Sequence, residues 1–134
     1  MRLRVYVAGA YSAPNVMDVL GNIGRGIEAC KTLLQAGYAP FCPWLDFLLV
    51  IQQGGNQKLT IEDMYEYTLA WLESADVLLI LPGWENSKGT KAEIDRAIEL
   101  GIPVCYSGAE LRTKFPPNHR GRDSGQAGGE QTAS

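Results

Sequence analysis

The stretch VLLILPGWENSKGTKAEIDRAIELG, residues 77–101, decides the fold because it holds a strand, a turn and a helix in immediate succession. Its first part, Val77 to Leu81, is a run of branched apolar residues, which is typical of a strand buried on both faces of a sheet. A helix is then predicted from about Thr90 to Leu100, ended by Gly101, with an inward face formed by Ile94, Ala97 and Ile98. A buried strand followed by such a helix is the repeating unit of parallel α/β sheets.

The same alternation continues outside this stretch. Three more β-rich runs are predicted as strands, at residues 3–8, 38–42 and 102–106. A helix that Gly37 ends is predicted from apolar residues at helical spacing, namely Ile23, Ile27, Cys30 and Leu34. Strands that alternate with helices predict right-handed βαβ crossovers onto a parallel sheet.

A further helix is predicted after Thr60. Asp63 follows three residues later, which is a weak form of the capping box at a helix start. The predicted apolar stripe of this helix consists of Ile61, Met64, Thr68, Trp71, Leu72 and Ala75.

Length and composition restrict the class of protein. A chain of 134 residues, 46% hydrophobic and 20% charged, is typical of one globular domain. The net charge of −3 and the absence of a dense Lys/Arg block disfavour a nucleic-acid or membrane partner, because both require clustered positive charge. No run resembles a signal peptide or a membrane span, so we expect a cytoplasmic protein. The three cysteines lack the spacing of zinc or redox sites, and we expect reduced cysteines, no metal site and no cofactor.

Two segments depart from the strand and helix pattern. Residues 43–59 join an apolar patch to a polar run, and two interpretations fit: an irregular, mobile segment bordering a pocket, or a short helix and a loop without a role. Toward the C-terminus the composition becomes polar, so we expect a domain over residues 1–112 and a disordered tail over residues 113–134. His119, the single histidine, lies in that tail, which disfavours chemistry that requires histidine.

A ligand site is expected where two loops meet. In open parallel sheets, ligands bind beyond the C-terminal ends of the strands, where neighbouring loops diverge. With the strand order 2-1-3-4, these would be the loops at residues 9–15 and 82–89, both rich in small residues and each followed by a helix. Helix N-termini attract anions, so a phosphate or a sugar suits this place.

Glu93 has two interpretations on pattern alone. The spacing Thr90-Lys91-Ala92-Glu93 is that of a capping box, in which the Glu93 side chain would turn back to the Thr90 backbone. Alternatively, the carboxylate points across the turn toward a bound ligand. Local sequence does not distinguish the two.

Three motifs resemble the nucleoside 2-deoxyribosyltransferase family. They are the segments 5–9 (VYVAG), 69–77 (LAWLESADV) and 87–93 (SKGTKAE), and the likeness extends over roughly residues 3 to 106. The resemblance implies a flavodoxin-like, three-layer, doubly wound parallel sheet of four or five strands. It also implies cleavage of the N-glycosidic bond of a nucleoside or nucleotide. Glu93 would be the nucleophile that attacks C1′ and forms a glycosyl-enzyme ester, and Tyr6 would orient Glu93 or shield that ester.

The residue six positions before Glu93 separates two branches of that family. Transferases that act on free nucleosides tend to have aspartate there, whereas the 2′-deoxynucleoside 5′-phosphate N-hydrolases have a serine that contacts phosphate. Ser87 favours the hydrolase branch. We therefore predict catalytic roles for Glu93 and Tyr6 and a substrate-binding site formed by Gly9, Ala10, Tyr11, Ser12, Trp84, Ser87, Lys88, Gly89 and Thr90. Trp84 and Tyr11 would stack the base, although packing of Trp84 against a neighbouring loop fits equally.

The sequence departs from the family pattern at two places. Thr68 stands where the family usually has an acidic residue, and Asp63 and Glu66 are the candidates to replace it. The first loop has Ala10 and Ser12 where the hydrolases carry a serine and an arginine that grip phosphate.

The resemblance implies a small-molecule nucleoside or nucleotide as ligand, with free base released to water or exchanged for a second base. It also implies a homo-oligomer, a dimer or larger. Two other functions fit: a non-catalytic nucleotide-binding protein that uses the same cleft, and a glutamate-dependent enzyme that releases nicotinamide.

Overall fold

The computed structural model describes residues 1–52 and 58–117. Within them, four parallel strands form one sheet in the order β2-β1-β3-β4. The strands are β1 (Arg4–Ala8), β2 (Ala39–Phe41), β3 (Val77–Ile80) and β4 (Val104–Cys105). Each was predicted from its apolar run. The order is the one in which the loops after β1 and β3 are neighbours that lead to opposite faces of the sheet.

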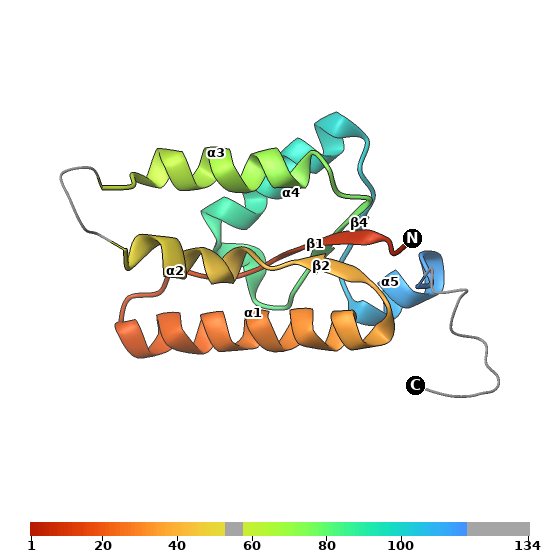
Figure 1. The fold of residues 1–134 in the computed structure, drawn as a ribbon, viewed down its shortest axis with the longest axis horizontal. Coiled ribbons are helices and arrows are strands. Elements are labelled where there is room, and N and C mark those ends of the chain that lie inside the picture. Colours follow the sequence, from red (N-terminus) through yellow and green to blue (C-terminus); the bar gives the residue numbers. More distant parts are fainter. Residues whose placement is uncertain (53–57, 118–134) are drawn as a thin grey trace.

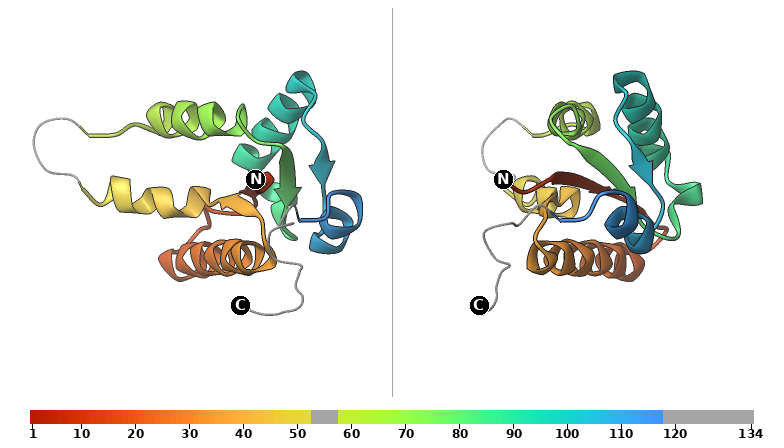
Figure 2. Two further views of the ribbon diagram at one scale, coloured as in Figure 1. Left: turned by 45° about the vertical axis from the view of Figure 1, so that its right-hand side comes forward. Right: turned by 90° about the vertical axis from the view of Figure 1, so that its right-hand side faces the viewer.

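Helices cover both faces of the sheet, which gives the predicted three-layer, flavodoxin-like α/β fold (Figures 1 and 2). The helix α1 lies on one face, and α3 and α4 lie on the other. A short helix that the sequence did not predict, α5, packs on the same face as α1. Their bounds are α1 (Val16–Ala36), α3 (Ile61–Leu72), α4 (Lys88–Leu100) and α5 (Gly108–Lys114).

Alternate residues of β1 point into two separate cores, because successive side chains of a strand lie on opposite faces. Val5 and Val7 enter the core beneath α1 and α5. Tyr6 and Ala8 enter the core beneath α3 and α4. Tyr6 therefore lies on the same side of the sheet as helix α4, where Glu93 is found.

The helix ends follow local sequence signals. Gly37 and Gly101 end α1 and α4 in the left-handed conformation, with φ of 108° and 74°. Thr60 and Asp63 form a complete capping box at the start of α3, which is stronger than the weak form predicted.

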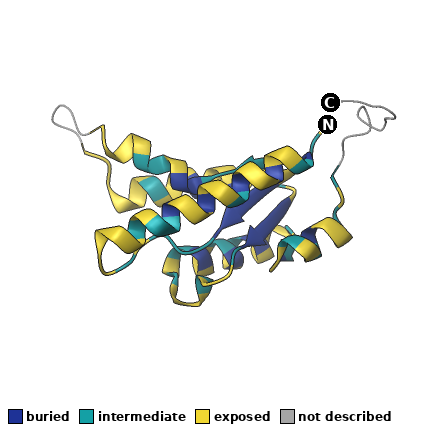
Figure 3. Cartoon of the chain, turned by 90° about the horizontal axis from the view of Figure 1, so that it is seen from below, coloured by how far each residue is buried: buried dark blue, intermediate teal, exposed yellow. Residues whose placement is uncertain are grey.

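The predicted inward faces of the helices were partly wrong. Five of the residues assigned to them are substantially exposed instead: Ile27, Leu34, Ile61, Trp71 and Ile98. Figure 3 shows how exposed and buried positions alternate along the helices. In α1, Ile23 and Cys30 are buried as predicted, but the other two buried residues are Gly26 and Leu33, each one position before the residue predicted. The reason is the Trp44 ring, which lies so close to α1 that a Cβ added at Gly26 would be 2.1 Å from it.

The segment after β2 is helical at its start. It forms a 3-10 helix, η1 (Pro43–Asp46), followed by the short helix α2 (Phe47–Val50). Of the two interpretations, the short helix is confirmed for these residues and the irregular structure is wrong, although the segment does border a pocket. The rest of the polar run, residues 53–57, lies outside the described residues.

The folded part of the chain extends beyond residue 112, where the domain was predicted to end. Helix α5 continues to Lys114, and the Phe115 carbonyl accepts a hydrogen bond of 2.8 Å from the Tyr38 hydroxyl. Of the predicted disordered tail, residues 118–134 lie outside the described residues. In the part of the chain that the structure describes, no helix combines the length and apolar character needed to cross a membrane.

Candidate functional site

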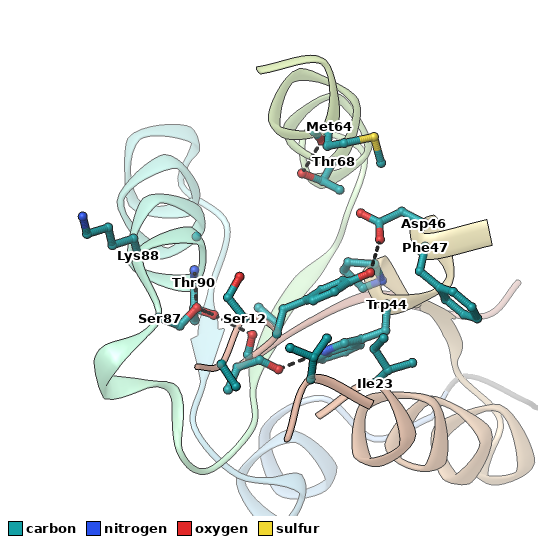
Figure 4. Close-up of a pocket in the computed structure, with 18 of the residues that line it drawn as sticks. Ser12, Ile23, Trp44, Asp46, Phe47, Met64, Thr68, Ser87, Lys88 and Thr90 are labelled. Atoms are coloured by element: carbon teal, nitrogen blue, oxygen red, sulfur yellow. Dashed lines mark hydrogen bonds between the residues drawn. The ribbon is translucent and has the colours of Figure 1, made fainter. Parts of the chain in front are cut away.

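A cavity of about 810 Å³ opens beyond the C-terminal ends of β1 and β3. This is the place at which parallel sheets of this order bind ligands. Figure 4 shows Ser87 and Thr90, from the start of α4, on one side of it and Trp44, Asp46 and Phe47 on the other. Thr68 and Met64, from α3, lie above them in the same view.

Most predicted binding residues border this cavity. The two loops meet there as expected, contributing Gly9, Ala10, Tyr11, Ser12, Ser87, Lys88, Gly89 and Thr90. In Figure 4 the Lys88 side chain extends away from the other residues drawn, although its base borders the cavity. Trp84 is not among the lining residues. It belongs to the 3-10 helix η2 (Trp84–Asn86), and its ring packs against Tyr106 with the centroids 5.8 Å apart.

The start of α4 excludes the capping interpretation of Glu93. The N-cap is Ser87, whose side chain accepts a hydrogen bond of 3.2 Å from the Thr90 backbone N–H. Because the helix begins three residues earlier than the capping box at Thr90 would require, Glu93 lies in its second turn. Its side chain borders the cavity.

Thr90 joins the two loops. Its fully buried hydroxyl donates a hydrogen bond of 3.0 Å to the Gly9 carbonyl and lies 2.9 Å from the Ser87 hydroxyl. These bonds hold the start of α4 against the end of β1.

Glu93 is held by Tyr6. The Tyr6 hydroxyl, on a side chain with no exposed surface, donates a hydrogen bond to the Glu93 carboxylate. Burial, the negative charge of Glu93 and this bond raise the pKa of Tyr6 far above its ordinary range, so the phenol stays protonated and remains a donor.

The environment of Glu93 raises the pKa of its carboxyl group toward neutral pH. Burial raises the pKa of the carboxyl group from 4.5 to about 7, the bond from Tyr6 opposes that rise, and the negative charge of Asp46 adds to it. A carboxyl group in this range is ionised in a large fraction of molecules at neutral pH. Glu93 can therefore act as a nucleophile or base, and in its protonated form as an acid.

Asp46 is a second carboxylate at the cavity, and sequence reasoning missed it. It ends the 3-10 helix η1 and accepts a hydrogen bond of 2.9 Å from the Tyr11 hydroxyl. Burial raises its pKa, and the bond from Tyr11 lowers it. The signal in the sequence was a single acid within the apolar patch at residues 44–49, between Leu45 and Phe47.

Two other contacts fix this part of the cavity wall. The Trp44 indole donates a hydrogen bond of 3.0 Å to the Ala10 carbonyl, which ties η1 to the loop after β1. The Asn22 amide donates one of 3.0 Å to the Tyr11 carbonyl, which ties the same loop to α1. Tyr11 and Asp46 are thus brought together from segments that are 35 positions apart in sequence.

The acidic residue that the resemblance to the deoxyribosyltransferases implies has no counterpart among the α3 residues at the cavity. Thr68 borders the cavity, but it is buried and its hydroxyl bonds back to the Met64 carbonyl at 3.1 Å. Asp63 serves the capping box, and Glu66 is exposed. Neither residue lines the cavity.

Within residues 1–52 and 58–117, no three His, Cys, Asp or Glu side chains come together as a metal site would need. A comparison with family models matches residues 3–106 to the family described as Domain of unknown function (DUF4406). The match covers most of the chain, which therefore belongs to this family. A search of curated proteins finds no match.

Proposed function

We propose that this member of the DUF4406 family cleaves the N-glycosidic bond of a nucleoside or of its 5′-monophosphate and releases the free base. Glu93 would be the nucleophile. The observation that carries the proposal is the position of Glu93, which borders a cavity of about 810 Å³ and accepts a hydrogen bond from Tyr6. The three motifs that resemble the nucleoside 2-deoxyribosyltransferases support the same assignment, because both residues stand at matching positions.

The reaction follows from the chemistry of a carboxylate at an anomeric carbon. A Glu93 oxygen attacks C1′, the bond from C1′ to the base nitrogen breaks, and a glycosyl ester of Glu93 forms. The Tyr6 hydroxyl holds the carboxylate in place and stabilises its ionised form. Water or a second base then attacks C1′ and frees Glu93.

The test is base release from a panel of ribo- and deoxyribonucleosides and their 5′-monophosphates, measured by chromatography. The wild-type protein should release base from at least one compound, and intact-mass spectrometry should detect the glycosyl ester. Glu93→Gln keeps the size of the side chain but removes the nucleophile, so release should fall at least about a thousandfold. Glu66→Gln, an exposed acid on α3, is the matched control and should retain wild-type activity.

Other results would decide against this function. Unchanged release by Glu93→Gln would contradict the proposed nucleophile. If no compound is cleaved by the wild type, while a nucleotide raises the melting temperature of both proteins, the site is a binding site without catalysis. Inclusion of a second free base in the assay distinguishes transfer from hydrolysis.

A further inference from the structure

The proposed chemistry requires a proton at the departing base. When the bond from C1′ breaks, the base nitrogen takes the electron pair, and its departure is easier if an acid protonates the base. The same group, once ionised, is placed to deprotonate the water that hydrolyses the glycosyl ester. At the α3 position where the deoxyribosyltransferases usually have an acidic residue, this chain has Thr68. The Thr68 hydroxyl donates a hydrogen bond to the backbone of its own helix.

Asp46 is the other carboxylate among the described residues that line the cavity. It reaches the cavity from η1, on the opposite side from the start of α4 (Figure 4). It lies close enough to Glu93 for its charge to affect the ionisation of that residue. A ligand between η1 and α4 would therefore have one carboxylate on each side.

The surroundings of Asp46 keep it available to a ligand. One carboxylate oxygen accepts the hydrogen bond from Tyr11, which orients the group. The side chain is partly buried, at the end of a helix that Trp44 anchors to the loop after β1. A partly buried carboxyl group with raised pKa, oriented by a fixed donor, is typical of an acid/base residue.

We propose that Asp46 is the acid/base residue of this site. It would take the role of the acidic residue that the deoxyribosyltransferases have at the position of Thr68. The proposal rests on the proposed function. In the first step, Glu93 forms the bond to C1′, the bond from C1′ to the base breaks, and the Asp46 proton moves to the base. In the second, Asp46 takes a proton from water, the water oxygen bonds to C1′, and the ester bond to Glu93 breaks. The reactive form has Glu93 ionised and Asp46 protonated, so the proton that burial favours on Glu93 has to lie on Asp46 when the reaction begins.

The test compares two leaving groups. 2′-Deoxyguanosine 5′-monophosphate needs a proton at its base, whereas the 7-methylguanine analogue carries a positive charge on the base and leaves without one. With Asp46→Asn, kcat/KM for the first should fall about 100- to 10,000-fold, and for the second it should change less than about tenfold. Asp95→Asn, which removes an exposed acid on α4, is the control and should leave both unchanged.

The asparagine can still accept the bond from Tyr11, and circular dichroism verifies that the variant is folded. The wild-type protein provides a second measurement that requires no variant. With an acid that assists departure, release should depend only weakly on the leaving ability of the base across a series of purines, whereas a steep dependence would overturn the proposal.

The outcomes separate this inference from the proposed function. If Asp46→Asn releases both bases at the wild-type rate, or loses both equally, Asp46 is not the acid, but Glu93 can still be the nucleophile. If the wild-type protein releases base from neither compound nor from any other tested, both proposals are overturned.

Discussion

The Tyr6 hydroxyl donates a hydrogen bond to the Glu93 carboxylate, and so links the inner strand β1 to helix α4 across 87 positions of sequence. Tyr6 faces α4 because it alternates with Val5 and Val7, which face α1. The carboxylate is thereby held at the cavity rather than at the helix start. This bond also opposes the effect of burial on the Glu93 pKa.

Removal of the Tyr6 hydroxyl should move the pH dependence of the proposed base release. In Tyr6→Phe the donor that favours ionised Glu93 is lost, so the pKa of Glu93 should rise above about 7. Base release should fall by about tenfold at pH 6 to 7 and approach the wild-type rate at pH 9, since one pKa unit is a factor of ten. The pH–rate profile of base release measures this. Tyr67→Phe is the control and should keep the wild-type profile. If the acid limb of the profile in Tyr6→Phe lies at the same pH as in the wild type, the prediction is contradicted.

Glu93→Gln should make the protein more stable at neutral pH. The folded-state pKa of Glu93 is raised from 4.5 to about 7, so the folded protein holds a proton that the unfolded chain releases. The contribution of Glu93 to the free energy of unfolding is therefore fully present below about pH 4.5 and is lost as the pH rises to about 7. The loss is roughly 3 kcal/mol for this shift.

Urea denaturation of both proteins at pH 5 and pH 8 tests this. The free energy of unfolding should fall between the two pH values in the wild type, and the fall should be smaller in Glu93→Gln. An equal pH dependence in the two proteins would show that Glu93 is ionised at little cost in the folded state.

Gly26→Ala should destabilise the fold and disturb the cavity wall. The added Cβ would lie 2.1 Å from the Trp44 ring, so either the ring or α1 has to move. We expect a loss of about 3 kcal/mol or more in the free energy of unfolding, because overpacking forces side chains and backbone to shift. Gly24→Ala is the matched control on the same helix. A Cβ there meets nothing within 4 Å, and the change should stabilise the protein by roughly 0.5–1 kcal/mol. Equal effects of the two substitutions would contradict the close contact.

Trp84 should contribute to stability rather than to substrate binding. Its ring packs against Tyr106, and it does not line the cavity. A double-mutant cycle with Trp84→Leu and Tyr106→Leu should give a coupling energy of about 0.5–1.5 kcal/mol in urea denaturation. The KM of Trp84→Leu for any substrate of the wild type should stay within about twofold. A large rise in KM with no coupling would instead indicate that Trp84 stacks the base.

The strands and the helix ends were predictable because their signals are local. Apolar runs such as Val77 to Leu81 indicated the strands, and Gly37 and Gly101 indicated the helix ends. The inward faces were less predictable. At helical spacing, Ile27 and Leu34 are as suitable as Gly26 and Leu33, and the choice between them depends on where Trp44 packs.

The sequence by itself determined the alternation of strands and helices, the two small-residue loops and the residues that resemble a nucleophile motif. These features depend on spacing along the chain, and spacing is visible in the sequence. Tertiary structure alone decided which way Glu93 points, and it alone placed Asp46 at the same cavity. The reason is that Tyr6, Tyr11, Asp46 and Glu93 come from four segments, and hydrogen bonds between residues 35 and 87 positions apart exist only once the sheet has brought their elements together.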